Sequence, residues 1–366
     1  MDVIIDWLRS GKPFVFYRLP GEQTCHGIRS DLSSLQYSED VSSLNHASGY
    51  VFAPFQSGKG HPLCLLPADE EVCFVLSRRR DDVVEAPAPV PSVGPVCETP
   101  SAEYAGIFSR FSAALVSGEY SKLVLSRRWS AECPPGFSLA EAFAVACQRY
   151  VHSYVYLLYI PHIGYWLGAT PEILLSGCGN DYKTVALAGT QSLDRGHASV
   201  EWSEKNIREQ RYVSDYICDC LRKRGIEPSV EGPLTVTAGA LAHLKTEIRF
   251  TWDAAGHIGD LLKELHPTPA VCGLPEKEAC RFISGNEGYD RGYYAGFLGR
   301  SDAFGRTDLY VNLRCMQVDE GKENLCLFAG GGLLAASRCA DEWMETERKL
   351  QTMKYVIQKS EAHVFG

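Results

Sequence analysis

A charged segment follows three consecutive glycines in the C-terminal part of the sequence, and its residue types could bind an anion and a cation. Gly330 to Gly332 lack Cβ atoms, so the backbone here could approach a ligand closely and point its N–H groups at an anion. Glu342, Glu345 and Lys349 follow at spacings that would line one face of a helix. Two carboxylates on one face could bind Mg2+ together with substrate oxygens, and the lysine could bind a substrate carboxylate. A glycine-rich turn before a solvated amphipathic helix would give the same pattern.

A further acidic residue, Glu209, lies on the apolar face of another predicted helix. The segment 202–225 has helical periodicity, with Ser203 as a capping residue and Gly225 as a stop. Glu209 would share its face with apolar residues at four-residue spacing, namely Val213, Ile217 and Leu221. A carboxylate on such a face is costly unless it has a partner. Glu209 is therefore either a solvated residue at the rim of the face or a ligand of a bound cation.

Strands separated by short breaks dominate the elements that would position these side chains. Residues 1–80 are expected to form short strands and turns. The predicted strands are Phe14–Leu19, Gly49–Phe55, Glu71–Ser77, Lys122–Trp129, 153–161, 165–177, 182–190, Glu247–Trp252, 292–299 and 308–317. The predicted helices are Ser101 to near Gly118, 138–150, 202–225, Gly259–Leu265 and the segment after the glycines. Because few helices separate the strands, an antiparallel sheet is favoured over a Rossmann arrangement.

The composition is that of a globular protein with one large domain or two ordinary ones. The chain has 366 residues, 45% of them hydrophobic, and its net charge of -9 argues against a nucleic-acid partner. Residues 1–100 are a strand-rich segment that we expect to join the same fold as 101–366, with a proline-rich excursion at 81–100. No segment has the length of an uncharged membrane span, and the 14 cysteines show no CxxC pair or zinc spacing. We expect a cytoplasmic protein with no membrane contact, as a monomer or a simple homo-oligomer.

Several motifs in a fixed order carry a resemblance to a known family. They are KLVLSRR (122–128), GATPEILLS (168–176), ALAGT (186–190), SEKNIREQ (203–210), HLKT (243–246), LHPTPAVCGLP (265–275), YDRGYYAGFLG (289–299), LYVNLRC (309–315) and AGGGLLAASRCADEWMET (329–346). The series resembles the chorismate-utilising enzymes, which include isochorismate synthase, salicylate synthase and anthranilate synthase component I. The resemblance covers roughly Ser101 to Lys354 and implies that 101–366 is a chorismate-binding catalytic domain.

The resemblance implies a fold and a metal site. The fold is α+β, with two packed, largely antiparallel sheets flanked by helices, as in anthranilate synthase component I. The pocket binds chorismate with Mg2+. Glu209 and Glu345 match the direct Mg2+ ligands of the family, and Glu342 matches a supporting carboxylate that acts through water. The metal would neutralise the ring carboxylate of the substrate.

The resemblance also implies the acid and the base of the reaction. Family members displace the 4-hydroxyl of chorismate, and Glu172 matches the general acid that protonates it. Lys122 matches the lysine that activates water for attack at C2 in the isochorismate and salicylate branches. Anthranilate-type members, which this site otherwise resembles, carry Gln in place of Lys122. Aminodeoxychorismate-type members carry a lysine nucleophile where this chain has Ala188. Both differences favour hydration over amination.

The remaining matches concern substrate binding. Arg314 and Lys349 match residues that bind the substrate carboxylates, and Gly332 would offer its N–H to the enolpyruvyl carboxylate. Other matches line the pocket around the ring, namely Gly189, Thr190, His243, Thr268 and the small residue Ala270.

Together these matches imply an isomerase that converts chorismate to isochorismate for menaquinone or siderophore biosynthesis. Salicylate synthase, which goes on to eliminate pyruvate, is the nearest alternative, and an aminating component is a more distant one. A non-catalytic ligand-binding homologue is a further alternative. It is disfavoured because Lys122, Glu172, Glu209 and Glu345 are all present.

Overall fold

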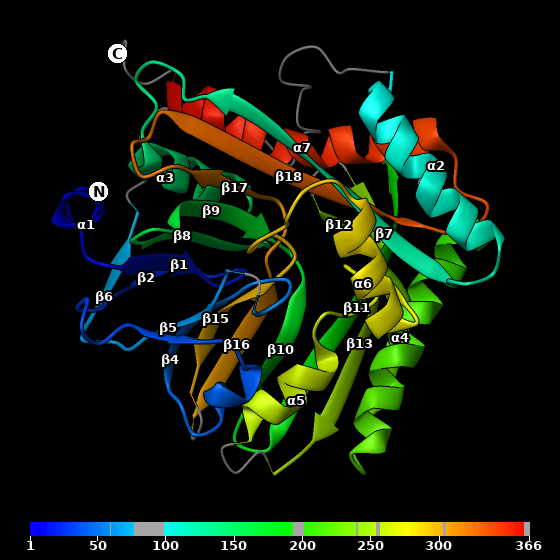
Figure 1. The fold of residues 1–366 in the computed structure, drawn as a ribbon. Coiled ribbons are helices and arrows are strands. Elements are labelled where there is room, and N and C mark those ends of the chain that lie inside the picture. Colours follow the sequence, from blue (N-terminus) through cyan, green and yellow to red (C-terminus); the bar gives the residue numbers. More distant parts are fainter. Residues whose placement is uncertain are drawn as a thin grey trace.

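Two nine-stranded antiparallel sheets form the body of the molecule (Figure 1). The computed structural model describes residues 1–58, 60–76, 99–192, 201–238, 241–253, 257–302 and 305–361. The first sheet has the order β14 (Gly273–Leu274), β7 (Lys122–Glu132), β18 (Asn324–Leu333), β17 (Cys315–Val318), β9 (Gly164–Thr170), β8 (Tyr154–Ile160), β1 (Phe14–Arg18), β2 (Thr24–Arg29) and β6 (Glu70–Val75). The second has the order β12 (Ser229–Ala238), β13 (Leu241–Thr251), β11 (Asp181–Ser192), β10 (Ile173–Cys178), β16 (Arg306–Val311), β15 (Phe297–Ser301), β4 (Gly49–Ala53), β5 (Leu63–Leu66) and β3 (Gln36–Ser38).

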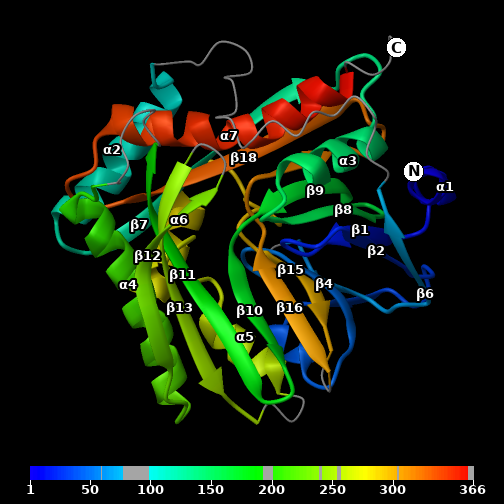
Figure 2. The same cartoon turned by 180° about the vertical axis from the view of Figure 1, so that it is seen from behind.

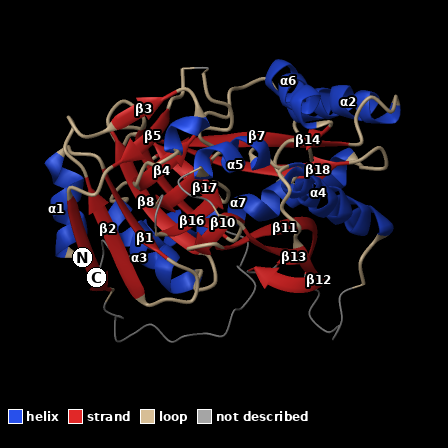
Figure 3. Cartoon of the chain, turned by 90° about the horizontal axis from the view of Figure 1, so that it is seen from below, coloured by secondary structure: helices blue, strands red, loops and turns tan. Residues whose placement is uncertain are grey.

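Helices pack around these sheets. They are α1 (Asp2–Ser10), α2 (Ala102–Val116), α3 (Leu139–Arg149), α4 (Glu204–Lys223), α5 (Ile258–Leu265), α6 (Glu276–Asn286) and α7 (Cys339–Glu361), with a 3-10 turn η1 (Val41–Leu44). Helix α7 lies along β18, and α4 lies along β11 and β13 (Figure 2). Helices α2 and α6 lie side by side near β7 and β14 (Figure 3). No helix in the described part of the chain is both long and apolar enough to cross a membrane.

The first sheet buries both of its faces, and β1 illustrates how. Val15 and Tyr17 belong to a hydrophobic cluster that reaches into the second sheet, where it includes Tyr50. Phe14 and Phe16 point the other way, into a cluster with α1, α3 and α7. Because successive side chains of a strand alternate between faces, a continuous apolar run is what a strand covered on both sides requires.

The expected α+β fold class with two antiparallel sheets is confirmed, and the caps of two helices are as predicted. The Ser101 hydroxyl accepts a hydrogen bond from the Tyr104 N–H at the start of α2. Ser203 does the same for Asn206 at the start of α4, and Gly225 has the left-handed backbone of a helix stop, with φ 73°. Strands from residues 1–76 pair within both sheets, while residues 77–98, which contain most of the proline-rich stretch, lie outside the described residues. The domain division at residue 100 stays a prediction.

Several element predictions are wrong, and the pairing of the strands explains some of these differences. Amphipathic α1 lies where short strands were expected, and α6 was not predicted at all. Runs 165–177 and 308–317 each break in the middle, because the chain passes there from one sheet to the other. The run 292–299 is strand only from Phe297. The glycines are not a turn either: Gly330–Gly332 lie inside β18, where the ladder with β7 outweighs the poor strand propensity of glycine.

Candidate active site

One pocket collects most of the side chains that the sequence singled out. It lies between the first sheet and the β11–β13 part of the second, and encloses about 720 Å3, part of which is open to solvent. The predicted residues that line it are Glu172, Gly189, Thr190, Glu209, His243, Ala270, Arg314, Gly332, Glu345 and Lys349. The three others lie just behind the lining. Lys122 is fully buried, Thr268 is buried with its hydroxyl unpartnered, and Glu342 is buried with one carboxyl oxygen unpartnered.

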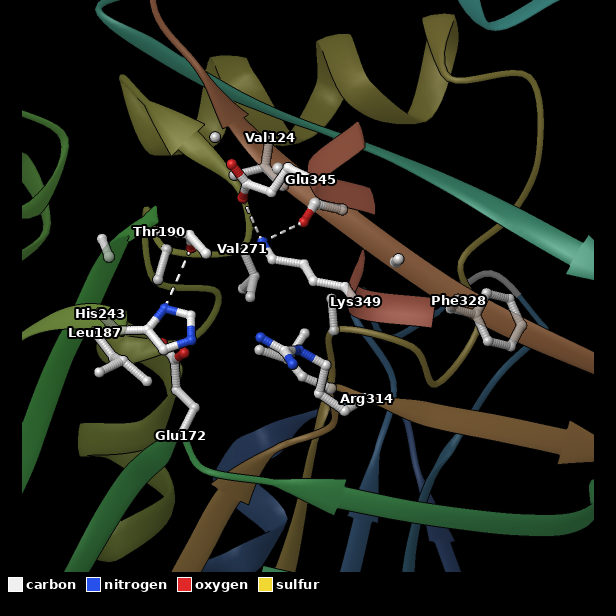
Figure 4. Close-up of a pocket in the computed structure, with 18 of the residues that line it drawn as sticks. Val124, Glu172, Leu187, Thr190, His243, Val271, Arg314, Phe328, Glu345 and Lys349 are labelled. Atoms are coloured by element: carbon white, nitrogen blue, oxygen red, sulfur yellow. Dashed lines mark hydrogen bonds and ion pairs between the residues drawn. The ribbon is translucent and has the colours of Figure 1, made fainter. Parts of the chain in front are cut away.

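Glu172 and Arg314 lie where the chain crosses between the sheets. Glu172 separates β9 from β10, and Arg314 separates β16 from β17. The two crossings are adjacent because β9 pairs with β17 and β10 pairs with β16. Backbone bonds tie them together: Val311 N donates to Glu172 O at 2.9 Å, and Ala169 N donates to Arg314 O at 3.1 Å. An acid and a cation from distant parts of the sequence thus enter one pocket (Figure 4).

The backbone of Arg314 is strained. Its φ of 49° is in the left-handed region, which costs a non-glycine residue on the order of 1 kcal/mol. The residue is partly buried, and among the described residues its guanidinium has no hydrogen-bond partner; loss of solvation lowers its pKa. Strain of this kind persists where the surrounding structure enforces it, and it directs a free bidentate donor into the pocket.

Burial keeps Glu172 close to neutral. It raises the pKa of the Glu172 carboxyl to about 7, against the lowering effect of the Lys122, Lys349 and Arg314 charges. The effect of burial is larger because Glu172 is 5% exposed and makes no ion pair within the described part of the chain. Near neutral pH this carboxyl holds a proton that it can donate.

A β-bulge positions His243 opposite this acid. The register of β11 with β13 shifts between Ala188 and Thr190, around Gly189 with φ 73°. A Cβ at Gly189 would come within 3.0 Å of Asn206 O, so glycine is required here. The bulge pairs Thr190 with His243, and the Thr190 hydroxyl lies 3.2 Å from His243 Nδ1. Burial, and then the Arg314 and Lys349 charges, hold the His243 pKa well below its ordinary value, so the ring is neutral and its Nε2 has no partner in the described structure.

Lys122 is buried against a carboxylate. Its Nζ lies 3.1 Å from Glu209 Oε1 of α4, and the side chain is fully buried at the start of β7. The two meet beside β18, where Gly332 pairs with Val124. A Cβ at Gly332 would overlap Glu209 Oε1 and lie 2.9 Å from Lys122 Cε, so glycine leaves the space that this ion pair fills. Glu209 is therefore a buried, partnered residue and not a solvated one at the rim of α4.

Helix α7 supplies a second set of paired charges. Lys349 Nζ lies 2.7 Å from Glu345 Oε1 and donates to Gly330 O at 2.7 Å (Figure 4). Burial alone would raise the Glu345 pKa, but the neighbouring cations Lys349, Lys205 and Arg314 together outweigh it and the pKa is lowered. Glu342 contacts Lys205, the second residue of α4, yet burial and the Glu345 charge raise its pKa to about 7. Lys205 was not predicted, although it lies in the SEKNIREQ motif four residues before Glu209.

The carboxylates have the donor chemistry of a hard divalent cation site. Glu342 keeps one buried oxygen without a partner, and a Cβ at Gly331 would lie 3.1 Å from that oxygen and 3.5 Å from Glu345 Oε1. Because the glycines of β18 lack Cβ atoms, space is left beside these carboxylate oxygens. Carboxylate oxygens are ligands that Mg2+ prefers. In the described structure no three acidic groups are gathered closely enough to enclose an ion, and each of these carboxylates is paired with a lysine.

Some lining residues received no role from the sequence. They are Val124, Leu187, Val271, Arg291, Tyr294, Leu313 and Phe328. Arg291 and Tyr294 lie in the YDRGYYAGFLG motif, so a signal was present, but spacing alone does not tell a buried arginine from a surface one.

Comparisons with known proteins point to one family. A family model described as chorismate binding enzyme matches residues 77–358. Isochorismate synthase DhbC of Bacillus subtilis is 31% identical over 257 residues, which cover 66% of this chain but only 64% of that protein. The crystal structure of DhbC from Bacillus anthracis has a TM-score of 0.78 at 23% identity and covers 97% of this chain and 99% of that one. Anthranilate synthase component I of Streptococcus pneumoniae TIGR4 has a TM-score of 0.66 at 19% identity, covering 93% and 92%.

Proposed function

The chain belongs to the chorismate-binding enzymes, and from that premise we propose that it is an isochorismate synthase. It converts chorismate to isochorismate by adding water at C2 of the ring and releasing the 4-hydroxyl. The name of the DhbC relative supports this choice within the family. The observation that carries it is the combination of Glu172, a buried carboxyl with a pKa of about 7 in the pocket lining, with Lys122, a buried lysine that contacts the lining residue Glu209.

Each of these two side chains handles one proton of the reaction. Lys122, in its uncharged form, takes a proton from the attacking water, and Glu172 gives its proton to the departing 4-hydroxyl. The acid must be neutral before the reaction, and burial, which raises the pKa of Glu172 to about 7, supports that requirement. The base must be neutral as well, so the Lys122 ammonium, which lies 3.1 Å from Glu209 Oε1, has to give up its proton before water attacks.

The remaining polar groups hold the substrate. The free guanidinium of Arg314 and the ammonium of Lys349 bind its two carboxylates, and neutral His243 contacts the ring hydroxyl without adding charge. Glu209 and Glu345 would hold Mg2+, with Glu342 acting through water, and the bound ion supplies positive charge beside the ring carboxylate. Glu342 is suited to this supporting role because one of its oxygens has no partner in the described structure.

Two residues favour hydration over the amination that other members carry out. Lys122 stands at the position where anthranilate-type members carry Gln. Ala188 stands at the position where aminodeoxychorismate-type members carry a lysine nucleophile. Ala188 is buried next to the β11 bulge, and its methyl group offers no nucleophile.

Product analysis tests this proposal. Purified protein is incubated with chorismate and Mg2+, and the products are identified by mass spectrometry and NMR. We expect isochorismate, formed reversibly, and its loss in Lys122→Ala. Salicylate and pyruvate as the main enzyme-dependent products would replace this proposal with the salicylate synthase reaction. An ammonia-dependent aminated product would contradict hydration altogether.

A further inference from the structure

We propose that Arg291 and Glu287 act as a positioning pair, which holds the lysine-bearing strand β7 and the pocket turn 268–272 in register with each other. This inference rests on the proposed function, because it concerns the placement of Lys122 for the hydration step. The pair does not contact the reacting atoms in this role. It acts through Val124 on one side and Val271 on the other, both of which line the pocket.

The pair is buried and bidentate. Its side chains are 2% and 1% exposed, with Arg291 Nε 2.6 Å from Glu287 Oε2 and Nη2 2.7 Å from Glu287 Oε1. The remaining hydrogen bonds of the guanidinium are to the backbone: Nη1 donates to Val271 O at 2.7 Å and Nη2 donates to Val124 O at 2.9 Å. Two segments far apart in sequence are thus held by one rigid planar group.

The pair also continues a strand ladder that would otherwise stop. The short strand β14 pairs with β7 only at Leu123 and Lys122, and Cys272 O accepts from Val124 N just beyond it. Past that point Arg291 donates to Val124 O, and Glu287 Oε1 accepts from Ser126 N at 2.6 Å. Arg291 thus supplies the donor for Val124 O, and Glu287 supplies the acceptor for Ser126 N, at the positions where a neighbouring strand would supply backbone groups. Without the pair, two buried backbone groups of β7 would be left unsatisfied.

The pair therefore fixes the position of the strand that carries Lys122 relative to the turn that carries Thr268 and Ala270. Lys122 opens β7 two residues before Val124, and Ala270 precedes Val271 in the turn. The turn itself is closed by bonds from Val271 N and Cys272 N to Thr268 O, each 3.0 Å. A shift of Arg291 would therefore move the backbone that carries Lys122 relative to the turn that carries Thr268 and Ala270.

Arg291 is not a second binder of a substrate carboxylate, although it lines the pocket. Glu287 neutralises its charge, and four N–H groups of the guanidinium already have protein acceptors. Arg314, in the same pocket, has neither a hydrogen-bond partner among the described residues nor a paired carboxylate. The two arginines of the pocket therefore have different tasks: the partly buried Arg314 has donors free for a ligand, whereas the buried Arg291 donates to protein acceptors.

A neutral double variant separates positioning from simple loss of fold. Arg291→Met with Glu287→Gln removes both charges together, and replacing a buried pair in this way is often neutral for stability, whereas removing one partner leaves a buried charge. We expect a folded protein with kcat lowered about 30-fold and KM changed less than about 3-fold, because misplacement of a reacting group costs rate while the substrate cations stay in place. Arg291→Lys, which keeps the charge but not the fork, should fold and show an intermediate kcat.

The matched control is Arg18→Lys. Arg18 is also buried and also donates to backbone carbonyls, those of Tyr150, Val151 and Ser153 among them, but it belongs to β1 and does not line the pocket. It should keep kcat within about 2-fold. Crystal structures add a readout that does not depend on activity: the distance from Lys122 Nζ to Glu209 Oε1, 3.1 Å here, should lengthen in the double variant and stay unchanged in the control.

The outcomes distinguish this inference from the proposed function. A wild-type enzyme that makes isochorismate, together with a folded double variant that matches Arg18→Lys in kcat and in the Lys122–Glu209 distance, would overturn the positioning pair alone. A double variant that raises KM and leaves kcat unchanged would assign Arg291 to substrate binding and also overturn it. If the double variant does not fold, the same comparison is made with Arg291→Lys. A wild-type protein that does not hydrate chorismate would overturn the proposed function, and this inference with it.

Discussion

The two walls of the pocket handle buried charge in opposite ways. On the wall formed by β7, β18 and α7, each acidic group has an ammonium partner: Lys122 with Glu209, and Lys349 with Glu345. On the wall formed by the sheet crossing and β13, Glu172 and His243 have no counter-ion among the described residues, and burial moves the pKa of each toward the neutral form. Pairing therefore offsets the cost of burying ions on one side, and burial without a partner removes charge on the other. Glu342 on α7 is the exception, because burial and the Glu345 charge raise its pKa to about 7 although Lys205 contacts it.

This difference matches the division of labour in a hydration that releases a hydroxyl. In the proposed reaction Glu172 would hold a proton for the leaving group, while Lys349, together with Arg314 at the sheet crossing, would bind the substrate carboxylates, and the carboxylates of the charged wall would bind the cation. Substitutions that introduce charge on one wall or disturb pairing on the other should have different signatures. The expected effects run from the loss of the acid to the weakening of one substrate contact.

The largest effect is expected for Glu172→Gln. Glutamine keeps the shape and the burial but cannot donate a carboxyl proton, so kcat should fall about 1000-fold with a much smaller change in KM. Steady-state kinetics with chorismate measures both. Unchanged turnover would remove Glu172 from the mechanism and leave the neutral wall without a function.

Gly332→Ala should disturb the charged wall almost as strongly. Its Cβ would overlap Glu209 Oε1 and crowd Lys122 Cε at 2.9 Å, so the ion pair must separate, and we expect kcat to fall about 100-fold through the misplaced base. Gly285→Ala is the control, because an added Cβ at Gly285 meets no atom within 4 Å and lies in helix α6, where alanine is favoured. An equal loss in both variants would mean that the ion pair has no part in turnover.

The pH dependence should report the neutral wall. Glu172 has a pKa of about 7, so kcat/KM should fall about tenfold per pH unit above pH 7 as the acid loses its proton. Its folded pKa lies above the unfolded value, so its contribution to stability is complete below pH 4.5 and is lost as the pH rises through 7. Chemical denaturation between pH 4 and 8 tests this second effect. Glu172→Gln should lose that part of the pH dependence, and retention of it would assign the titration to another group.

The smallest effect is expected for Arg314→Lys. Lysine keeps the positive charge but not the bidentate fork, so KM for chorismate should rise about tenfold while kcat changes less. Isothermal titration of chorismate into Glu172→Gln, and into the same variant that also carries Arg314→Lys, checks that binding itself is weakened. A lower kcat at constant KM would place Arg314 in the chemical step.

Local patterns predicted part of this site. For Glu209 the apolar face of α4 left two alternatives open, a solvated rim residue or a cation ligand, and the structure instead buries the acid against Lys122. The helical spacing of Glu342, Glu345 and Lys349 on α7 is as expected. The resemblance supplied Lys122 and Glu172 as members of one pocket; in the structure Glu172 lines the pocket, and Lys122 is buried behind the lining residue Glu209. These features depend on a few neighbouring residues or on a motif in fixed order.

The rest depends on pairing between distant strands, which no local pattern contains. Gly330–Gly332 are strand residues only because β7 lies beside them. The breaks at Glu172 and Arg314 reflect adjacent crossings between sheets, and the partners of Arg291 come from three separate segments. Periodicity within a segment could not reveal any of these contacts.

The protonation state of Glu172 in the free enzyme is the most direct test of the difference between the two walls. Difference infrared spectroscopy of the wild-type protein against Glu172→Gln, taken across a pH series, isolates the signal of this carboxyl. We expect a protonated carboxyl at pH 6 that titrates near pH 7. A carboxyl that is already ionised at pH 5 would contradict it.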